Sequence, residues 1–401
     1  MLDVPNELLL AISTHLDHHD LRALATSSQS LCCLLLPEYL RRRGLVLKDT
    51  STRGVGVELH VLGGYATLGL WSVVRNFHPP EDVYCSIPYG VQDARSAMAF
   101  LLRFLQEPLN SCNLQNFHIF LHSDSYLPTS GLCEIQRLFS VLPLRDLCIS
   151  GFCSANHLSP PIALRSGWSS GSRTLTSFTI SSDHAFTPGM VRTTMGILNH
   201  SPIKSLRIYM VSLNPRQWST LLGELNMKIL EDMEVEGDIP RPALIRFLTK
   251  HKGLQRICIR CNMVSDRAIP SRSQHEDFLP SLLTLRAPLA VCCDIVERVS
   301  PTKLSEVEVE VSRLQPFDPL LLRLMDNLGR FRKLDNFGFR VGPSPQSVTP
   351  QDRLDDHDWD GHPACSLRQV RTLSFVQNQS RLSPGDIVRP PSPFRYLPYL
   401  I

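Results

Sequence analysis

The sequence predicts an α/β fold in which a small three-helix unit precedes a long array of strand–helix repeats that share a parallel sheet. Two observations lead to this prediction. Residues 2–44 contain three short helical patterns, and from residue 114 onward the motif apolar-x-x-apolar-x-apolar occurs ten times. Successive motifs begin 22 to 36 residues apart, around the period of a repeat architecture.

The N-terminal segment carries the signals of three short helices. Pro5 stands at the start of the first, where its missing N–H has no cost, and apolar residues follow at three- and four-residue spacing. Asp20 is predicted to be the N-cap of the second helix. The third is predicted from Gln29 to Arg43, with Gly44 as its stop. Three helices in about forty residues bury little apolar surface, so this unit is expected to need a partner.

This segment resembles an F-box domain. The resemblance rests on the start Leu2-x-x-Pro5-x-Glu7-Leu8 and on later residues at the family's positions, namely Ile12, Leu16, Asp20, Leu21, Leu24 and Ser27. An F-box docks on the Skp adaptor of a cullin-RING ubiquitin ligase. The resemblance therefore implies an adaptor-binding surface formed by Leu2, Pro5, Leu8, Leu9, Ile12, Leu16, Leu21 and Leu24. The family often has a bulky aromatic residue where Cys32 and Cys33 stand here. The alternative is a helical cap that shields one end of the next domain.

Residues 45–108 are interpreted as an adapter segment between this unit and the main body of the chain. Val55 to Leu62 alternates like a strand, Trp71 to Pro88 is predicted to be irregular, and Val91 to Leu105 is predicted to be a helix.

The repeats occupy residues 109–385, and a proline-rich tail follows over 386–401. The motifs begin at Leu114, Leu144, Leu175, Ile203, Leu230, Leu254, Leu282, Leu304, Leu334 and Val370. Helices are predicted over 132–142, 188–199, 215–225, 242–250 and 319–328. Neither a strand nor a helix of one unit can bury its apolar face alone, so stacking is expected to give a parallel sheet on the concave face with helices outside. This part is similar to the irregular leucine-rich-repeat solenoids associated with F-boxes; an ordinary α/β domain is the alternative.

A target-binding face is predicted on the concave side of these repeats. The residues between the buried ones of each strand face that side. Those chosen as target-binding are Phe120, Arg207, Tyr209, Glu234, Glu236, Arg260, Glu308, Glu310 and Arg340. The sign of the charge alternates along this face and aromatic residues lie at one end, which suits a protein partner better than a polyanion.

The composition limits the compartment and the class of partner. Apolar residues make up 43% of the 401, charged residues 20%, and the net charge of +3 is too small to indicate nucleic acid or a membrane as partner. The N-terminus lacks a basic region followed by an apolar one, and no apolar run reaches the roughly 18 residues of a membrane helix. A cytoplasmic or nuclear protein with reduced cysteines is expected.

Four short patterns were considered for chemistry, and none is expected to provide a catalytic residue, metal site or cofactor site. Gly167-Trp-Ser169-Ser-Gly171 matches a nucleophile elbow, but a loop precedes it and a strand follows it, the reverse of the required order. Asp356 to Gly361 matches the start of a calcium loop, but the twelfth position is Leu367 instead of Glu. The cluster from His15 to Asp20 lies in a predicted turn, and Cys258-x-x-Cys261 lacks a second pair.

The function that follows from the resemblance is a non-enzymatic one. The chain is expected to be the substrate-recognition subunit of a Skp-cullin-F-box ubiquitin ligase, with the repeats binding an unknown target protein. The first alternative is a repeat scaffold that does not recruit a ligase, and the second is an esterase that uses Ser169.

Overall fold

The computed structural model describes residues 4–42, 45–47, 54–58, 82–87, 115–121, 144–151, 172–187, 190–260, 278–300, 303–311, 318–341 and 370–377. The chain divides into two compact units, Met1–Ile203 and Lys204–Ile401.

Unit 1 begins with three helices, α1 (Asn6–His15), α2 (His18–Ser27) and α3 (Gln29–Arg42), as the sequence predicted. The prediction that Asp20 caps α2 was wrong. Asp17 is the N-cap, and its carboxylate accepts a 2.8 Å hydrogen bond from the backbone N–H of Asp20. Leu21 and Ala25 of α2 and Leu35 and Tyr39 of α3 are buried and form the small core of the three helices.

The sheet of unit 1 follows the helices. Its strands are β1 (Leu45–Leu47), β2 (Gly54–Glu58), β3 (Asp82–Ile87), β4 (Asn116–Leu121), β5 (Asp146–Gly151) and β6 (Ser177–Ser181). β1 pairs with β2 in the antiparallel direction, and each later strand in this unit is parallel to the one before it. The 3-10 helix η4 (Asp183–Phe186) and helix α7 (Val191–His200) complete the unit.

One prediction in this region was wrong and two lie outside the described residues. The segment from Trp71 to Pro88 was predicted to be irregular, but it contains β3, whose register is fixed by hydrogen bonding to β2 and β4. The helices predicted over Val91–Leu105 and 132–142 fall on residues that the structure does not describe.

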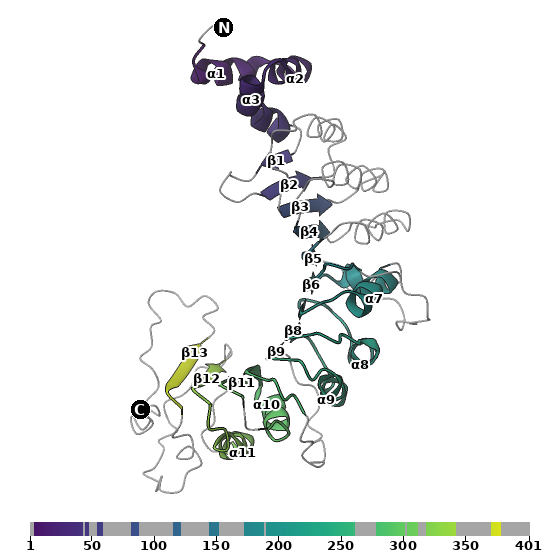
Figure 1. Cartoon of the computed structure of the whole chain (residues 1–401), viewed down its shortest axis with the longest axis vertical. Helices are drawn as coiled ribbons and strands as arrows, with labels where there is room; N and C mark the ends of the chain where they lie inside the picture. Colours follow the sequence, from purple (N-terminus) through teal and green to yellow (C-terminus); the bar gives the residue numbers. More distant parts are fainter. Residues whose placement is uncertain are drawn as a thin grey trace, which may run out of the picture. The chain divides into compact units, whose positions relative to one another are not determined.

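Unit 2 alternates strands and helices. In chain order these are β7 (Ser205–Ile208), α8 (Pro215–Glu224), β8 (Asp232–Glu236), α9 (Arg241–Lys250), β9 (Arg256–Arg260), β10 (Thr284–Pro288), α10 (Leu289–Val296), β11 (Glu306–Val311), α11 (Pro319–Leu328), β12 (Asn336–Val341) and β13 (Thr372–Gln377). Each strand is parallel to the next in the chain. Figure 1 shows α8 to α11 in a row along one side of these strands. The predicted α/β class and parallel pairing are confirmed.

A repeated backbone contact makes the motifs structurally equivalent. The carbonyl of Glu231, just before β8, accepts hydrogen bonds from Gln255 N at 2.7 Å and Arg256 N at 3.1 Å in the next repeat. The same double acceptance occurs at the carbonyls of Gln115, Arg145, Lys204, Gln255, Leu283, Ser305 and Asp335. A contact that recurs at the same motif position is the signature of stacked repeats, since each repeat is registered only against its neighbours.

The motif's apolar positions form the core between strands and helices. In the β9 repeat, Leu254, Ile257 and Ile259 are all at most 1% exposed. The residues between them are only partly covered, so each strand has one face in the core and one outside it. The outer face carries the charged residues of the candidate site.

Helix starts in unit 2 follow local sequence chemistry. The side chain of Asn214 accepts hydrogen bonds from the first-turn N–H groups of Arg216 and Gln217, and the side-chain carbonyl of Gln217 accepts one in return from the Asn214 N–H. Pro215 takes the first helical position that proline tolerates.

Candidate functional site

Two surfaces, one in each unit, could bind partners. The first is the outer face of α1, where large apolar side chains point outward. Leu8 is 55% exposed, Ile12 48% and Leu10 40%. Leu8 and Ile12 are one helical turn apart and lie on the same face, which we call the α1 surface, whereas Leu10 is two residues from each and points to another side of the helix. Exposed leucine and isoleucine side chains gathered on one short helix indicate an interaction site.

A polar contact, in addition to apolar packing, holds the inner side of α1. Ser13 is buried, and its backbone carbonyl accepts a 2.7 Å hydrogen bond from the guanidinium of Arg42 on α3. A second bond of 2.9 Å joins Arg42 to the carbonyl of Leu16, and the same side chain pairs with Glu38 at 2.8 Å. Arg42 therefore donates to two carbonyls at the C-terminus of α1, of which that of Ser13 also accepts a 3.3 Å bond from the Leu16 N–H.

The other predicted adaptor-binding residues occupy different environments. Pro5 is exposed, Leu9, Leu16 and Leu24 are half-buried, and Leu21 is fully buried among the three helices. Leu2 lies outside the described residues. Because Leu21 has no exposed surface, it could not contact an adaptor directly.

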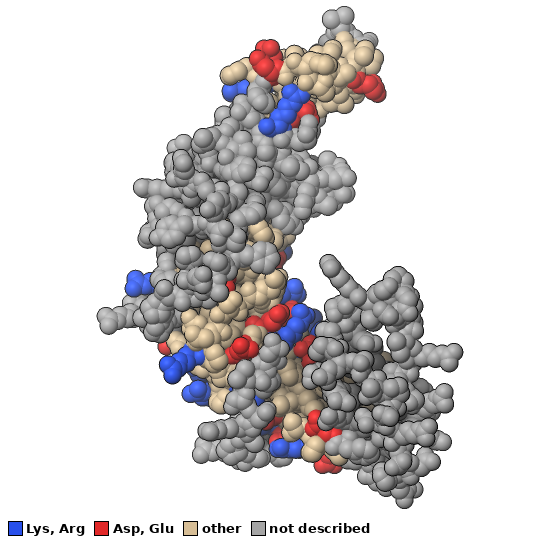
Figure 2. All heavy atoms as spheres, turned by 180° about the vertical axis from the view of Figure 1, so that it is seen from behind, with Lys and Arg blue, Asp and Glu red and all other residues tan. Residues whose placement is uncertain are grey.

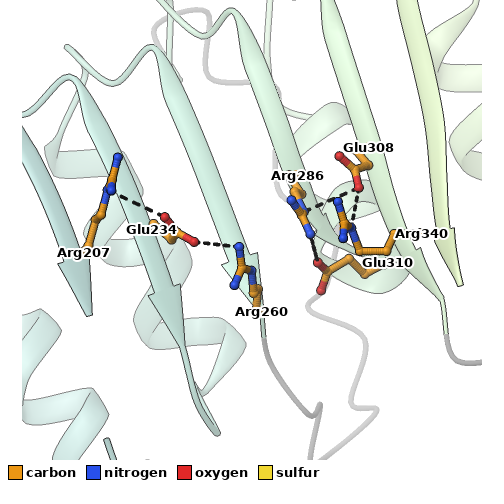
Figure 3. A network of polar contacts seen from close by, with 7 residues as sticks. All are labelled: Arg207, Glu234, Arg260, Arg286, Glu308, Glu310 and Arg340. Carbon is orange, nitrogen blue, oxygen red and sulfur yellow. Dashed lines mark hydrogen bonds and ion pairs between the residues drawn. The ribbon is translucent and has the colours of Figure 1, made fainter. Parts of the chain in front are cut away.

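The second surface is a set of alternating charges on the outer face of the strands in unit 2. We call it the charged ladder, and it comprises Arg207, Glu234, Arg260, Arg286, Glu308, Glu310 and Arg340 (Figure 3). Figure 3 shows these side chains in front of the strands, with helices behind. Figure 2 shows basic and acidic side chains next to one another on the described surface.

The ladder contains two clusters of ion pairs. In the first, Glu234 on β8 lies between two arginines, at 3.7 Å from Arg207 and 2.8 Å from Arg260. Arg207 directly faces Glu234 in the register of β7 and β8. The two guanidiniums therefore share one carboxylate.

The second cluster has two arginines and two glutamates. Arg286 on β10 is 3.6 Å from Glu308 and 3.0 Å from Glu310, both on β11. Arg340 on β12 approaches Glu308 to 2.7 Å. Each of these four side chains is about one-fifth exposed, so the cluster is far better shielded from water than Arg207.

Cys258 lies between the two clusters on β9, opposite Glu234 on one side and Arg286 on the other. Burial raises the pKa of its thiol above the ordinary value, and the neighbouring Arg286 only partly opposes this. The thiol therefore stays protonated near neutral pH and is a poor nucleophile. The arrangement provides shape and charge rather than a reactive group.

Most of the ladder was predicted from the sequence, but two residues that organise the surfaces were not. Arg286 lies between the last two apolar residues of the Leu282 motif, the same position as Arg207 and Glu234, so the motif could have identified it. Arg42 lies in the last turn of the third helix predicted from the sequence. Its contact with α1 spans 29 residues of sequence and leaves no local signal.

The remaining predicted target-binding residues are placed as follows. Tyr209 and Glu236 are half-buried beside the first cluster, on the segment after β7 and at the end of β8. Phe120 belongs to β4 of unit 1, where it is also half-buried.

The motifs considered for chemistry gain no support from the described residues. Ser169 and the stretches 167–171 and 356–361 lie outside them, as does Cys261. Among the described residues there is no group of three or more His, Cys, Asp or Glu side chains placed to bind a metal ion. None of the helices in this described part has the length and apolarity needed to cross a membrane.

No protein-family model matches the sequence, and no curated protein matches it either.

Proposed function

We propose that this chain is the substrate-recognition subunit of a Skp-cullin-F-box type ubiquitin ligase, acting in the cytoplasm or nucleus. Helices α1 to α3 would be the F-box and dock on a Skp-type adaptor through the α1 surface. The repeat region, with the pattern of a leucine-rich-repeat solenoid, would bind the target protein. The observation that carries the proposal is the outward position of Leu8 and Ile12.

The energetics of α1 favour a partner. Leu8 and Ile12 are 55% and 48% exposed, and covering that surface contributes about 1 kcal/mol per side chain. The inner contact of α1 is at the same time anchored by the bonds from Arg42, so the helix can present this surface without first being rebuilt. A preorganised apolar helix is the kind of element that inserts into a groove of another protein.

The proposed role involves no bond chemistry by this chain. A receptor that binds both adaptor and target raises the effective concentration of the target near the ubiquitin-loaded enzyme. The mixed charges of the ladder suit a protein target, because the glutamates within it would repel a polyanion such as nucleic acid.

Co-purification with a Skp adaptor tests the proposal. Wild-type chain is expected to bring down the adaptor, and Leu8→Asp is expected to abolish this by placing a charge in the apolar contact. Leu320→Asp is the matched control, because Leu320 is 39% exposed on α11 of unit 2. If wild type fails to bring down the adaptor, the alternative of a repeat scaffold without ligase recruitment is the better account.

A further inference from the structure

In the first cluster of the ladder, the two arginines do not contact Glu234 equally. Arg260 is close to Glu234, at 2.8 Å, whereas Arg207 makes one contact to the same carboxylate at 3.7 Å. The side chain of Arg207 is 58% exposed. Most of the five N–H donors of this guanidinium therefore have no acceptor among the residues that the structure describes.

The second feature is the carboxylate of Glu236, on the strand next to that of Arg207. Glu236 faces Arg260 in the register of β8 and β9. No ion pair joins it to another residue in the described part of the chain, because Arg260 bonds to Glu234 instead. Arg207 and Glu236 are thus an arginine and a glutamate on adjacent strands that share a surface without neutralising each other. Their α-carbons are about 8 Å apart, from one strand spacing and a two-residue rise.

An apolar feature borders these charges. Tyr209 and Met210 follow β7 directly, and Met210 is 57% exposed. The backbone of Met210 has φ of +56°, a left-handed conformation that is uncommon outside glycine and asparagine. Residues held in such conformations are concentrated at binding sites, and Arg, Tyr and Met are enriched in the centres of protein interfaces.

We infer that Arg207, Tyr209, Met210 and Glu236 form the docking patch for the target, and that the occupant is an extended protein segment with an acidic and a basic side chain separated by one residue. Alternate side chains of an extended segment lie on one face about 7 Å apart, which matches the spacing of Arg207 and Glu236. The acidic side chain pairs with Arg207, the basic one with Glu236, and a neighbouring apolar side chain packs on Tyr209 and Met210. This deepens the proposed function by naming the class of target.

Two other occupants fit less well. A nucleic acid would meet Glu234 and Glu236 as well as the arginines, and its phosphates would be repelled by both carboxylates. A second copy of the chain would have to bring its own Arg207 to the first copy's Glu236. These two possibilities become outcomes of the experiment.

The test is panning of a random dodecapeptide phage library on the full-length chain without adaptor. Wild type is expected to enrich peptides with Asp or Glu and Lys or Arg separated by one residue. Arg207→Glu is expected to change only the acidic position to Lys or Arg, and Glu236→Arg only the basic position to Asp or Glu. An enriched peptide, synthesised and labelled, is expected to bind Arg207→Glu at least about tenfold more weakly than wild type.

Matched controls separate the patch from general surface effects. Arg323→Glu changes an arginine of similar exposure, 48%, on α11, and Ile229→Ser changes an apolar side chain of similar exposure to Met210. Both are expected to bind the peptide within twofold of wild type, whereas Met210→Ser is expected to weaken binding several-fold.

Three results would overturn the inference. One is an enriched motif that neither charge reversal alters, and another is a wild-type dimer that Arg207→Glu dissociates, which would assign the patch to a second copy. The third is binding of a labelled single-stranded DNA 20-mer in preference to any peptide. Because the panning omits the adaptor, its result is independent of whether α1 recruits a ligase.

Discussion

Arg42 allows the link between the fold of the three helices and their proposed binding role to be tested. Arg42→Met removes the bonds to the carbonyls of Ser13 and Leu16 at 2.7 and 2.9 Å, and the pair with Glu38, while keeping the apolar stem. The side chain is 18% exposed, so water replaces these bonds only in part. Hydrogen bonds from a charged donor contribute about 1.5–3 kcal/mol each, so the free energy that holds α1 against α3 is expected to fall by roughly 3–5 kcal/mol.

The assay is hydrogen exchange of the α1 backbone amides, compared with those of α8 in unit 2. In Arg42→Met the α1 amides are expected to exchange at least a hundredfold faster, with α8 unchanged. Arg42→Lys is the control that keeps the charge but loses the forked geometry, and an intermediate rate is expected. Unchanged protection of α1 in Arg42→Met would refute the reasoning that this side chain anchors the helix.

Three further predictions concern unit 2. Gly237→Ala is expected to lower the free energy of unfolding by at least about 2 kcal/mol in a urea titration, because Gly237 has φ of +145° and a Cβ there would lie 2.8 Å from Nε1 of the buried Trp218. A loss below about 0.5 kcal/mol would contradict this reasoning. Arg241 on α9 and Asp294 on α10 form an ion pair whose side chains are only 12% and 11% exposed, so Asp294→Ala should lower the free energy of unfolding by about 3–5 kcal/mol. The double variant Arg241→Met with Asp294→Leu should lower it much less, and equal losses in the two proteins would argue against a buried pair. Burial lowers the pKa of His251 below 6.5, so the unfolded chain binds a proton that the folded chain excludes, and the free energy of unfolding should fall as the pH drops below about 6.5. In His251→Phe the plot of this free energy against pH should have a shallower slope, and identical slopes would exclude His251 as the cause.

The sequence was most informative where each repeat carries its own signal. The Leu254 motif predicts β9, because three apolar residues at this spacing must enter a core whatever else the chain does. β3 was missed because its position is fixed by pairing with β2 and β4, not by a local motif. α10 was missed because almost all of its residues are buried, so it lacks the polar stripe by which an amphipathic helix is found.

For the candidate sites too, the local pattern of each strand was informative and the contacts between repeats were not. Alternation in the strands predicted that Glu308 and Arg340 face the same side, and the structure places them 2.7 Å apart. The register between repeats follows the motif, because Leu285, Val307 and Phe337 occupy the same motif position and face one another. Which charge pairs with which could not be predicted, since a long side chain can reach either a direct or a diagonal neighbour. Glu308, for example, directly faces Gly338, and this leaves room for the diagonal contact with Arg340.

The most direct test of the proposed role is the dissociation constant of a purified Skp adaptor for the full-length chain, measured by isothermal titration calorimetry with wild type, Ile12→Asp and Leu320→Asp. Ile12 is 48% exposed on the α1 surface, and Leu320 is the distant residue of similar exposure. The account predicts that wild type and Leu320→Asp bind with dissociation constants within twofold of each other, and that Ile12→Asp binds at least about tenfold more weakly. Equal binding by all three proteins, or no binding by wild type, would contradict it.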